Sequence, residues 1–441
     1  MNVQIDFQKY HETLRAVSPL RVHGKVTRVT GLIVEGHGPA SSVGSQCLIY
    51  PGGATRPVFA EVVGFRDSRI LLMPLGEIRG ISPGSEIVSL DGKAVFNLDE
   101  SILGRVIDGT GEPLDGGPPI VGRHEYPIYG RTINPLKRAR IEKPMPLGIR
   151  AIDGLLTCAK GQRMGIFSGS GVGKSVLLGM IARNTEADVN VIALIGERGR
   201  EVREFIERDL GEEGLRRSVV VAATSDQPPL IRMRGAFIAT TVAEYFRDLG
   251  NDVVLMLDSV TRFSMSQREV GLAVGEPPTT KGYTPTVFTT LPKLMERAGN
   301  SNTGGSITGL YTVLVEGDDL SDPIADTARS ILDGHIVLSR DLAAQGHYPA
   351  IDVLQSVSRL MKETVLEEHR ALSTELIATL AAYTRAEDLI NIGAYVSGSN
   401  PKIDYAITMM DPINRFLRQG IDERVAFEQM LDELQRLFKK G

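Results

Sequence analysis

The residues of this chain whose types and spacing indicate chemistry form one glycine-rich stretch, Ser168-Gly169-Ser170-Gly171-Val172-Gly173-Lys174-Ser175. Residues 163–167 before it predict a short buried strand, and residues 176–182 after it predict a helix. A strand, a glycine-rich loop and a helix are the context of a phosphate-binding loop. Small residues let backbone N–H groups surround an anion, and the helix amino terminus adds its positive dipole end. The residues predicted to bind the nucleotide are Ser170, Gly171, Val172, Gly173, Lys174, Ser175 and Val176.

Two side chains of this loop have more specific roles. Lys174 can reach the β and γ phosphates of a nucleoside triphosphate, and the Ser175 hydroxyl can bind Mg²⁺. The loop departs from the usual pattern at its first position, where Ser168 stands in place of glycine. The Gly-Lys-Ser end is intact, and the loop therefore still predicts phosphate binding.

Two carboxylates follow predicted strands downstream of this loop. Residues 189–195 are mostly apolar and are followed by Gly196-Glu197-Arg198, and the predicted strand of residues 252–257 is followed by Asp258. Ligands of parallel α/β sheets bind at the carboxyl ends of the strands. Glu197 is our candidate for orienting or deprotonating the attacking water, and Asp258 for supporting Mg²⁺ or its water shell. Without the glycine-rich loop, a turn with solvated charges would be the better interpretation of Glu197.

Composition limits the class of protein. The chain has 441 residues, too many for one core, so two or three domains are expected. A formal net charge of −5 gives no general attraction to nucleic acid, and the two cysteines rule out a disulfide framework. The amino terminus lacks the pattern of a signal peptide, and no apolar stretch is long enough to span a bilayer. We expect a cytoplasmic protein that reaches any membrane through partners.

The predicted fold is multidomain, with a small amino-terminal β-barrel, a central α/β domain of the RecA-like type with a mainly parallel sheet, and a helical carboxyl-terminal domain. We place these domains at residues 1–93, 94–364 and 365–441. Short apolar runs between residues 20 and 90, separated by turn signals, indicate the barrel. Alternating strands and helices from about residue 146 indicate the central domain.

Three further segments have their own predictions. Residues 5–17 have apolar residues at helical spacing and predict a short helix that either caps the barrel or docks a regulator. Residues 101–145 are dense in glycine and proline and predict a loop-rich connector. Residues 366–382 and 423–440 predict the carboxyl-terminal helices.

Taken together, these motifs resemble the rotary ATP synthase α/β superfamily. The resemblance rests on residues 168–175, Gly196-Glu197-Arg198, residues 258–263 and the signature stretch 348–359. It covers nearly the whole chain and is greatest for the type III secretion ATPases, with residues 387–395 resembling their flagellar branch. It implies an Mg²⁺-dependent ATPase that forms a homohexameric ring and energises export of flagellar proteins, located in the cytoplasm beside the membrane export apparatus.

The resemblance also implies roles for individual residues. Arg359 resembles an arginine finger that reaches the neighbouring subunit's site, and Tyr348 resembles an aromatic residue that stacks on adenine. Arg198 and Glu201 match a second layer around Glu197. The catalytic residues that the resemblance implies are Lys174, Glu197 and Arg359. The amino-terminal segment is expected to dock a stator-like regulator. The carboxyl-terminal domain is expected to meet export substrates, chaperones or a central stalk, with the membrane export gate an indirect partner.

Three alternative functions remain open at this point. The ATPase of a virulence-type secretion injectisome would use similar machinery on other substrates. A ring-shaped RNA translocase would explain the basic residues of the barrel, but no aromatic residues accompany them as a stacking platform would require, and we expect no nucleic-acid partner. A nucleotide switch without useful hydrolysis would have no need of Glu197 and Arg359, which both serve the transition state.

Overall fold

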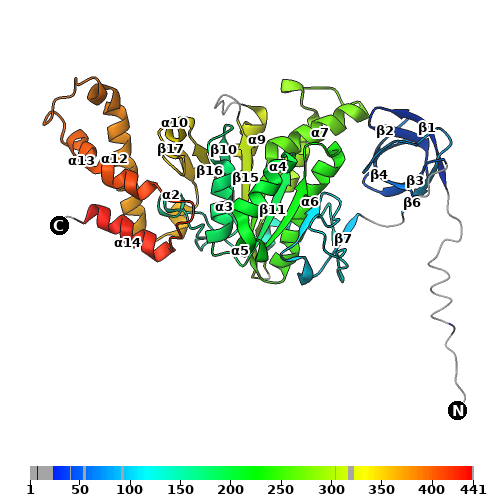
Figure 1. Cartoon of the computed structure of the whole chain (residues 1–441), viewed down its shortest axis with the longest axis horizontal. Helices are drawn as coiled ribbons and strands as arrows, with labels where there is room; N and C mark the ends of the chain where they lie inside the picture. The colour runs from blue at the N-terminus through cyan, green and yellow to red at the C-terminus, as the bar shows by residue number, and fades with distance from the viewer. Residues whose placement is uncertain are drawn as a thin grey trace, which may run out of the picture. The chain divides into compact units, whose positions relative to one another are not determined.

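The structure is a computed structural model that describes residues 7, 23–39, 41–52, 56–90, 94–302, 304–315 and 322–439 (Figure 1). The chain forms two compact units: unit 1 contains residues 1–94 and 273–275, and unit 2 contains residues 95–272 and 276–441. The helix expected over residues 5–17 lies outside the described residues, apart from the exposed Phe7. The docking role expected for that helix stays a prediction.

Unit 1 is a closed barrel of antiparallel strands in the order β1-β2-β5-β4-β3-β6. Side chains that alternate along the strands fill its core, including Val34, Ile49, Val62 and Leu72, which are fully buried. The predicted small barrel is therefore confirmed. The strands are β1 Gly24–Thr30, β2 Ile33–His37, β3 Gln46–Tyr50, β4 Val58–Arg66, β5 Arg69–Pro74 and β6 Glu86–Ser89.

Unit 2 is built on a mainly parallel sheet in the order β17-β16-β10-β15-β13-β11-β12-β8, with the short β14 pairing β15. Its central strands β11 and β12 are buried along their whole length and mostly apolar because helices cover both faces, as in other parallel sheets. Of the strands that the structure describes in this sheet, β17 and β14 run antiparallel to their neighbours and the others run parallel. The strands are β8 Val106–Asp108, β10 Arg163–Ser168, β11 Val189–Ile195, β12 Ser218–Ala223, β13 Asp252–Asp258, β14 Gly299–Asn300, β15 Ser306–Leu314, β16 Gly334–Leu338 and β17 Ile351–Ser358.

The helices around this sheet match the alternation predicted from residue 146 onward (Figure 1). One of them, the π-helix η3 over Phe205–Leu210, continues directly from α4 into α5. The α-helices are α2 Arg150–Leu155, α3 Lys174–Asn184, α4 Gly199–Glu204, α5 Gly211–Arg216, α6 Pro229–Asp248, α7 Val260–Val274, α8 Pro285–Met295, α9 Pro323–Ile331, α10 Arg340–Ala344 and α11 Met361–Thr364.

The connector expected over residues 101–145 is mostly loop, with a few short strands and 3-10 helices within it. Residues 106–108 form β8, which pairs with β12 and adds an edge strand to the main sheet. The connector region also contains a two-stranded ribbon of β7 (Val95–Leu98) and β9 (His124–Pro127). It includes two 3-10 helices, η1 (Glu100–Ile102) and η2 (Pro135–Lys137). Another 3-10 helix, η4 (Thr280–Gly282), lies between α7 and α8.

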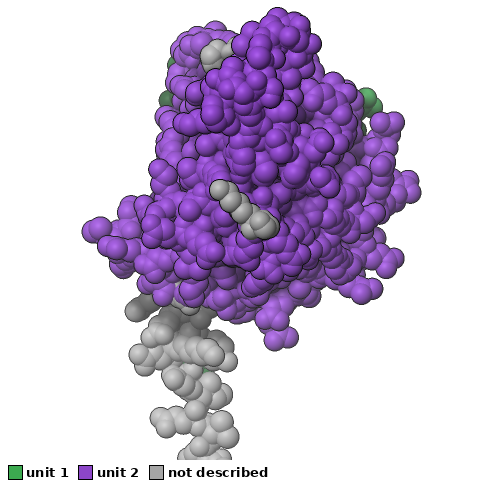
Figure 2. Space-filling view, turned by 90° about the vertical axis from the view of Figure 1, so that its left-hand side faces the viewer, with its two compact units in different colours: residues 1–94, 273–275 green, residues 95–272, 276–441 purple. Residues whose placement is uncertain are grey.

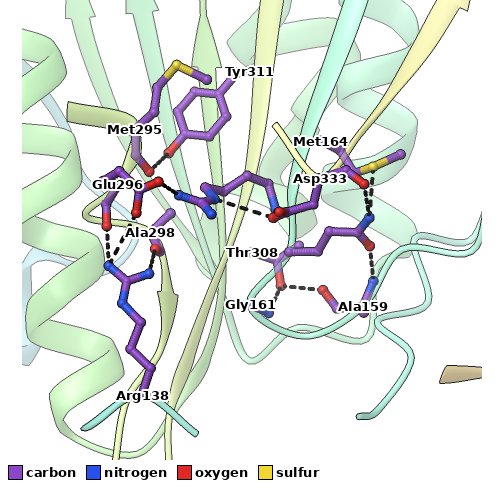
Figure 3. A network of polar contacts seen from close by, with 12 residues as sticks. Arg138, Ala159, Gly161, Met164, Met295, Glu296, Ala298, Thr308, Tyr311 and Asp333 are labelled. Atoms are coloured by element: carbon purple, nitrogen blue, oxygen red, sulfur yellow. Dashed lines mark hydrogen bonds and ion pairs between the residues drawn. The ribbon is translucent and has the colours of Figure 1, made fainter. Parts of the chain in front are cut away.

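A polar network fixes the amino-terminal ends of the central strands (Figure 3). Arg163 at the start of β10 pairs with Glu296 and, at 3.3 Å, with Asp333. Arg138 donates to the Ala298 carbonyl at 2.9 Å, and the Tyr311 hydroxyl to the Met295 carbonyl at 3.3 Å. The network joins the connector, α8 and three strands at the sheet edge opposite the glycine-rich loop.

The carboxyl-terminal region is helical, as expected, and consists of α12 (Glu367–Asn391), α13 (Pro401–Leu417) and α14 (Phe427–Phe438). Figure 2 views unit 2 from this end. The helix expected from residue 423 begins four residues later, and α13 had not been identified. Phe416 and Met430 pack near Gly154 of α2, which attaches the helices to the central sheet.

Candidate active site

The glycine-rich loop has the backbone that a phosphate-binding loop needs. It connects β10 to α3, and Gly171 and Gly173 have φ angles of 78° and 89°, in the left-handed region that favours glycine. A Cβ at Gly171 would meet nothing within 4 Å, whereas one at Gly173 would lie 3.5 Å from the Tyr348 ring. The 11-residue helix α3 begins directly at Lys174 and directs its unpaired N–H groups at the loop.

Strand order brings the predicted catalytic groups together at one edge of the sheet. The loop follows β10, Asp258 ends β13 and Glu197 follows β11, all at the carboxyl ends of parallel strands. The Lys174 ammonium pairs with the Asp258 carboxylate and lies 3.7 Å from Glu197 Oε1. The Thr312 hydroxyl donates to Asp258 Oδ1 at 2.7 Å. Three residues predicted from separate motifs therefore form one charged cluster.

Glu197 has the electrostatic properties of a group that can exchange a proton near neutrality. Burial raises its pKa to about 7, the nearby Lys174 opposes that shift, and the Asp258 charge adds to it. Its side chain is 15% exposed, so water can still reach the carboxylate. A carboxylate with this pKa matches the requirement for a general base at neutral pH.

Arg198 and Glu201, the predicted second layer, make different contacts beside Glu197. A hydrogen bond between Glu201 and Glu197 contributes to the raised Glu197 pKa. Arg198 Nη1 donates to Glu201 Oε1 at 3.2 Å, and the Arg198 side chain is 79% exposed. The exposed Arg198 guanidinium is thus linked to the Glu197 side chain through Glu201, and the role of both residues as a second layer stays a prediction.

The residues present fit a bound Mg²⁺. Ser175, the residue after Lys174, offers a hydroxyl, and Asp258, which pairs with Lys174, offers a carboxylate; both are hard oxygen ligands. Among the described residues, no group of three or more His, Cys, Asp or Glu is arranged to hold a metal by itself. That donor set suits Mg²⁺, which usually binds through one or two protein oxygens together with substrate phosphates and water.

A cavity of about 430 Å³ lies against the glycine-rich loop and has the character of a base pocket. Tyr348, which is 46% exposed, faces it, and its remaining walls are mainly aliphatic. The cavity is also lined by Gln419, Gly420 and Ile421, which follow α13 and which sequence reasoning missed. Their residue types carry no catalytic pattern, and more than two hundred positions separate them from the loop, so no local signal could have identified them.

A second cavity, of about 630 Å³, opens beside Ser168 and Ser170 and is lined by Arg262 and Arg268. The Arg262 Nε and Ser168 Oγ atoms are buried and have no hydrogen-bond partner among the described residues. Arg262 therefore belongs to the candidate site, although the sequence analysis gave it no role. Its position four residues after Asp258, on the first turn of α7, was the available signal.

Arg359 does not join the site of its own chain. It follows β17, is exposed, and its backbone N–H donates to the Asp333 carbonyl at the start of β16. The register pairs Ser358 with Gly334, so Arg359 lies at the amino-terminal end of the parallel strands. The length of β10, about 17 Å, separates that end from the glycine-rich loop.

Comparison with known proteins places this geometry in a family. Residues 148–358 match the ATP synthase alpha/beta family nucleotide-binding domain, residues 26–91 its beta-barrel domain, and residues 365–436 the T3SS EscN ATPase C-terminal domain. Among the described residues, no helix combines the length and apolar character needed to cross a bilayer.

Flagellum-specific ATP synthases and type 3 secretion system ATPases both align with nearly the whole chain. The flagellum-specific ATP synthase of Bacillus subtilis is 55% identical over 94% of this chain and 95% of its own length. That of Salmonella typhimurium is 51% identical over 95% and 94%. The type 3 secretion system ATPase of Xanthomonas euvesicatoria is 49% identical over 94% and 93%.

A solved structure gives the same result. The assembled ATPase EscN from the enteropathogenic E. coli type III secretion system superposes with a TM-score of 0.88 at 44% identity, over 94% of this chain and 99% of that one. Barrel, nucleotide-binding domain and helical region thus all have counterparts. The chain belongs to the ATP synthase alpha/beta family, in the branch that contains the flagellum-specific ATP synthases and the type III secretion ATPases.

Proposed function

We propose that this chain hydrolyses ATP, with Mg²⁺, to energise the type III export of flagellar proteins. The observation that carries the proposal is the cluster of Lys174, Asp258 and Glu197 beside the glycine-rich loop. The relatives named flagellum-specific ATP synthase, one of them 55% identical, support the flagellar role. The reaction class follows from a phosphate-binding loop combined with a carboxylate that can accept a proton near pH 7.

The proposed reaction is an attack of water on the γ-phosphorus. A bond forms from the water oxygen to phosphorus, the bond to the β–γ bridging oxygen breaks, and ADP and inorganic phosphate leave. Glu197 takes the proton from the water, and the backbone N–H groups of residues 170–176 hold the phosphates. Lys174 exchanges its contact with Asp258 for the phosphate oxygens, and Arg262 faces the developing charge from the second cavity.

Ser175 and Asp258 would hold the Mg²⁺ in this site. When bound, the ion supplies positive charge that neutralises the phosphate oxygens. Tyr348 and the aliphatic walls of the 430 Å³ cavity receive the adenine ring. An aromatic face and an apolar pocket suit a planar base, whereas they would not favour a second phosphate group.

Arg359 is proposed to complete the site of a neighbouring copy. An exposed arginine about 17 Å from its own loop cannot reach its own nucleotide, because its side chain is far shorter than that distance. In a homohexameric ring it would approach the next subunit's γ-phosphate. The solved structure of the assembled EscN supports such a ring, and that of EscN with its central stalk EscO supports a stalk partner.

The remaining partners are also proposals. We place export substrates and chaperones at the carboxyl-terminal helices, a stator-like regulator at the amino-terminal segment, and the protein in the cytoplasm beside the membrane export gate.

Expression in a Bacillus subtilis strain that lacks its own flagellum-specific ATP synthase would test the flagellar role. Restored motility supports it, and stable expression without motility contradicts it.

Glu197→Gln tests the catalytic proposal. The variant keeps the shape of the side chain but cannot accept a proton, so we expect ATP binding near the parent level and turnover reduced by about 10²–10⁴-fold. Binding is measured by equilibrium titration with a fluorescent ATP analogue, and turnover by phosphate release. Hydrolysis at the parent rate would show that Glu197 is not the base.

A further inference from the structure

The base pocket has a wall that is built by the carboxyl-terminal helical region. Gln419, Gly420 and Ile421 follow α13 and line the 430 Å³ cavity opposite the glycine-rich loop. The Gln419 backbone N–H donates to the Tyr348 carbonyl at 3.0 Å, and this bond connects the wall directly to the aromatic side of the pocket. How this wall is held therefore decides the shape of the pocket.

One buried arginine holds the wall from a different element. Arg150 begins α2, and the residue is only 7% exposed. Its Nε donates to the Phe416 carbonyl at 3.0 Å and its Nη2 to the Arg418 carbonyl at 2.6 Å. These carbonyls lie at the end of α13, where a helix has no internal donors left to offer, so Arg150 caps that helix end.

The remaining nitrogen of the same guanidinium fixes the loop itself. Arg150 Nη1 pairs with the Glu423 carboxylate, and Glu423 Oε2 accepts from the Gly420 N–H at 2.9 Å. The Gln419 side chain accepts from the Arg150 N–H at 2.9 Å and donates to the Gly148 carbonyl at 2.8 Å. The contacts converge on residues 419–423, and none of those named here involves the phosphate-binding residues 168–175.

We propose that Arg150 and Glu423 are positioning residues that set the affinity of the site for the nucleoside part of its ligand and leave the affinity for its phosphates unchanged. The inference rests on the proposed function, since it takes the 430 Å³ cavity to be the adenine pocket. Neither residue lines that cavity, so neither touches the nucleotide. Arg183 supports the same wall by donating from Nη2 to the Ile421 carbonyl at 2.8 Å.

The test compares two ligands that differ only by the adenosine part. ADP and pyrophosphate are measured as inhibitors of ATP hydrolysis by the full-length protein in the presence of Mg²⁺.

Glu423→Ala is the main variant, because the Glu423 side chain is 40% exposed and the fold does not depend on its burial. Arg150→Lys is the second, since lysine keeps the charge but cannot serve two carbonyls and a carboxylate together. Arg424→Ala is the matched control: Arg424 is the next residue and pairs with Glu213 on the exposed surface.

In both Glu423→Ala and Arg150→Lys we expect the inhibition constant of ADP and the KM for ATP to rise about tenfold. The inhibition constant of pyrophosphate and kcat at saturating ATP stay within about twofold, because the phosphate contacts are unchanged. Arg424→Ala changes none of these values.

Equal weakening of ADP and pyrophosphate would overturn the inference, and so would an unchanged constant for ADP in Glu423→Ala. A parent protein that does not hydrolyse ATP would instead contradict the proposed function. The two failures are therefore distinguishable.

Discussion

At the scale of residues, the site is arranged around the charge of Lys174. Its ammonium faces two carboxylates, Asp258 and Glu197, which are 4% and 15% exposed. Incoming phosphates would compete with these carboxylates for the same cation. Under the proposed function, bound phosphates would free the Asp258 carboxylate to help hold Mg²⁺, and would weaken the contact between Lys174 and Glu197.

The raised pKa of Glu197 predicts a pH dependence of activity. Below its pKa of about 7 the carboxyl is protonated in the free enzyme and cannot accept a proton from water. We expect kcat/KM to fall as the pH decreases through about 7, since that parameter reports groups of the free enzyme. Steady-state ATPase assays between pH 5.5 and 9, with ionic strength held constant, measure it.

The residual activity of Glu197→Gln is the control for this profile and should lack the inflection near pH 7, because the titrating group is gone. A parent profile that is flat between pH 6 and 8 would mean that Glu197 does not titrate during catalysis.

Tyr348 gives a second prediction at the residue scale. Tyr348→Ala removes the aromatic face of the base pocket, and we expect KM for ATP to rise about tenfold with a smaller change in kcat. Tyr348→Phe keeps the ring and should stay near the parent values. Equal KM values for the alanine variant and the parent in steady-state assays would show that adenine does not lie against this ring.

At the scale of elements, a buried ion pair joins two helices to the connector. Arg297, just after α8, pairs with Glu244 of α6, and their side chains are 1% and 9% exposed. Arg297 also donates to the Ile128 carbonyl at 2.7 Å and to the Thr241 hydroxyl at 2.9 Å. All these partners are buried, so removal of the guanidinium would leave a carboxylate and two oxygen acceptors without compensation.

Arg297→Met should therefore destabilise the protein by about 3–5 kcal/mol, the usual cost of breaking a buried pair. Urea denaturation followed by circular dichroism measures the change, because the chain contains no tryptophan for fluorescence. Arg216→Ala is the control, since its pair with Glu212 is at least 80% exposed on both sides and is expected to contribute at most about 1 kcal/mol. Equal midpoints for the two variants would contradict the structural role of Arg297.

Sequence predicted those elements whose signal is local. The residues of the phosphate-binding loop are consecutive, and Asp258 and Glu197 follow long apolar strands, so their meeting at one sheet edge could be anticipated. The helix α13 was missed because Pro412 lies inside it and interrupts its pattern, although Asn400 as the N-cap and Pro401 at the first helical position were available start signals. The wall over residues 419–421 could not be predicted, since it reaches the site only through tertiary contacts such as those of Arg150.

At the scale of the whole molecule, the structure separates two catalytic groups that the proposed reaction needs together. Glu197 lies at the carboxyl ends of the parallel strands, and Arg359 lies at their amino-terminal ends. One copy of the chain therefore presents a base on one side and an arginine on another. Such an arrangement is complementary head to tail, and head-to-tail contacts that close generate a ring.

The central claim, that each active site is completed by Arg359 of a neighbour, is tested by mixing two inactive variants. Glu197→Gln retains a working arginine, and Arg359→Ala retains a working base. ATP hydrolysis is measured for each variant alone and for an equimolar mixture under conditions where light scattering shows assembled rings. If Arg359 acts across the interface, the mixture recovers activity, up to about a quarter of the parent rate for random assembly, because interfaces with both intact groups form. A mixture of assembled rings that is no more active than the two variants alone would contradict the account.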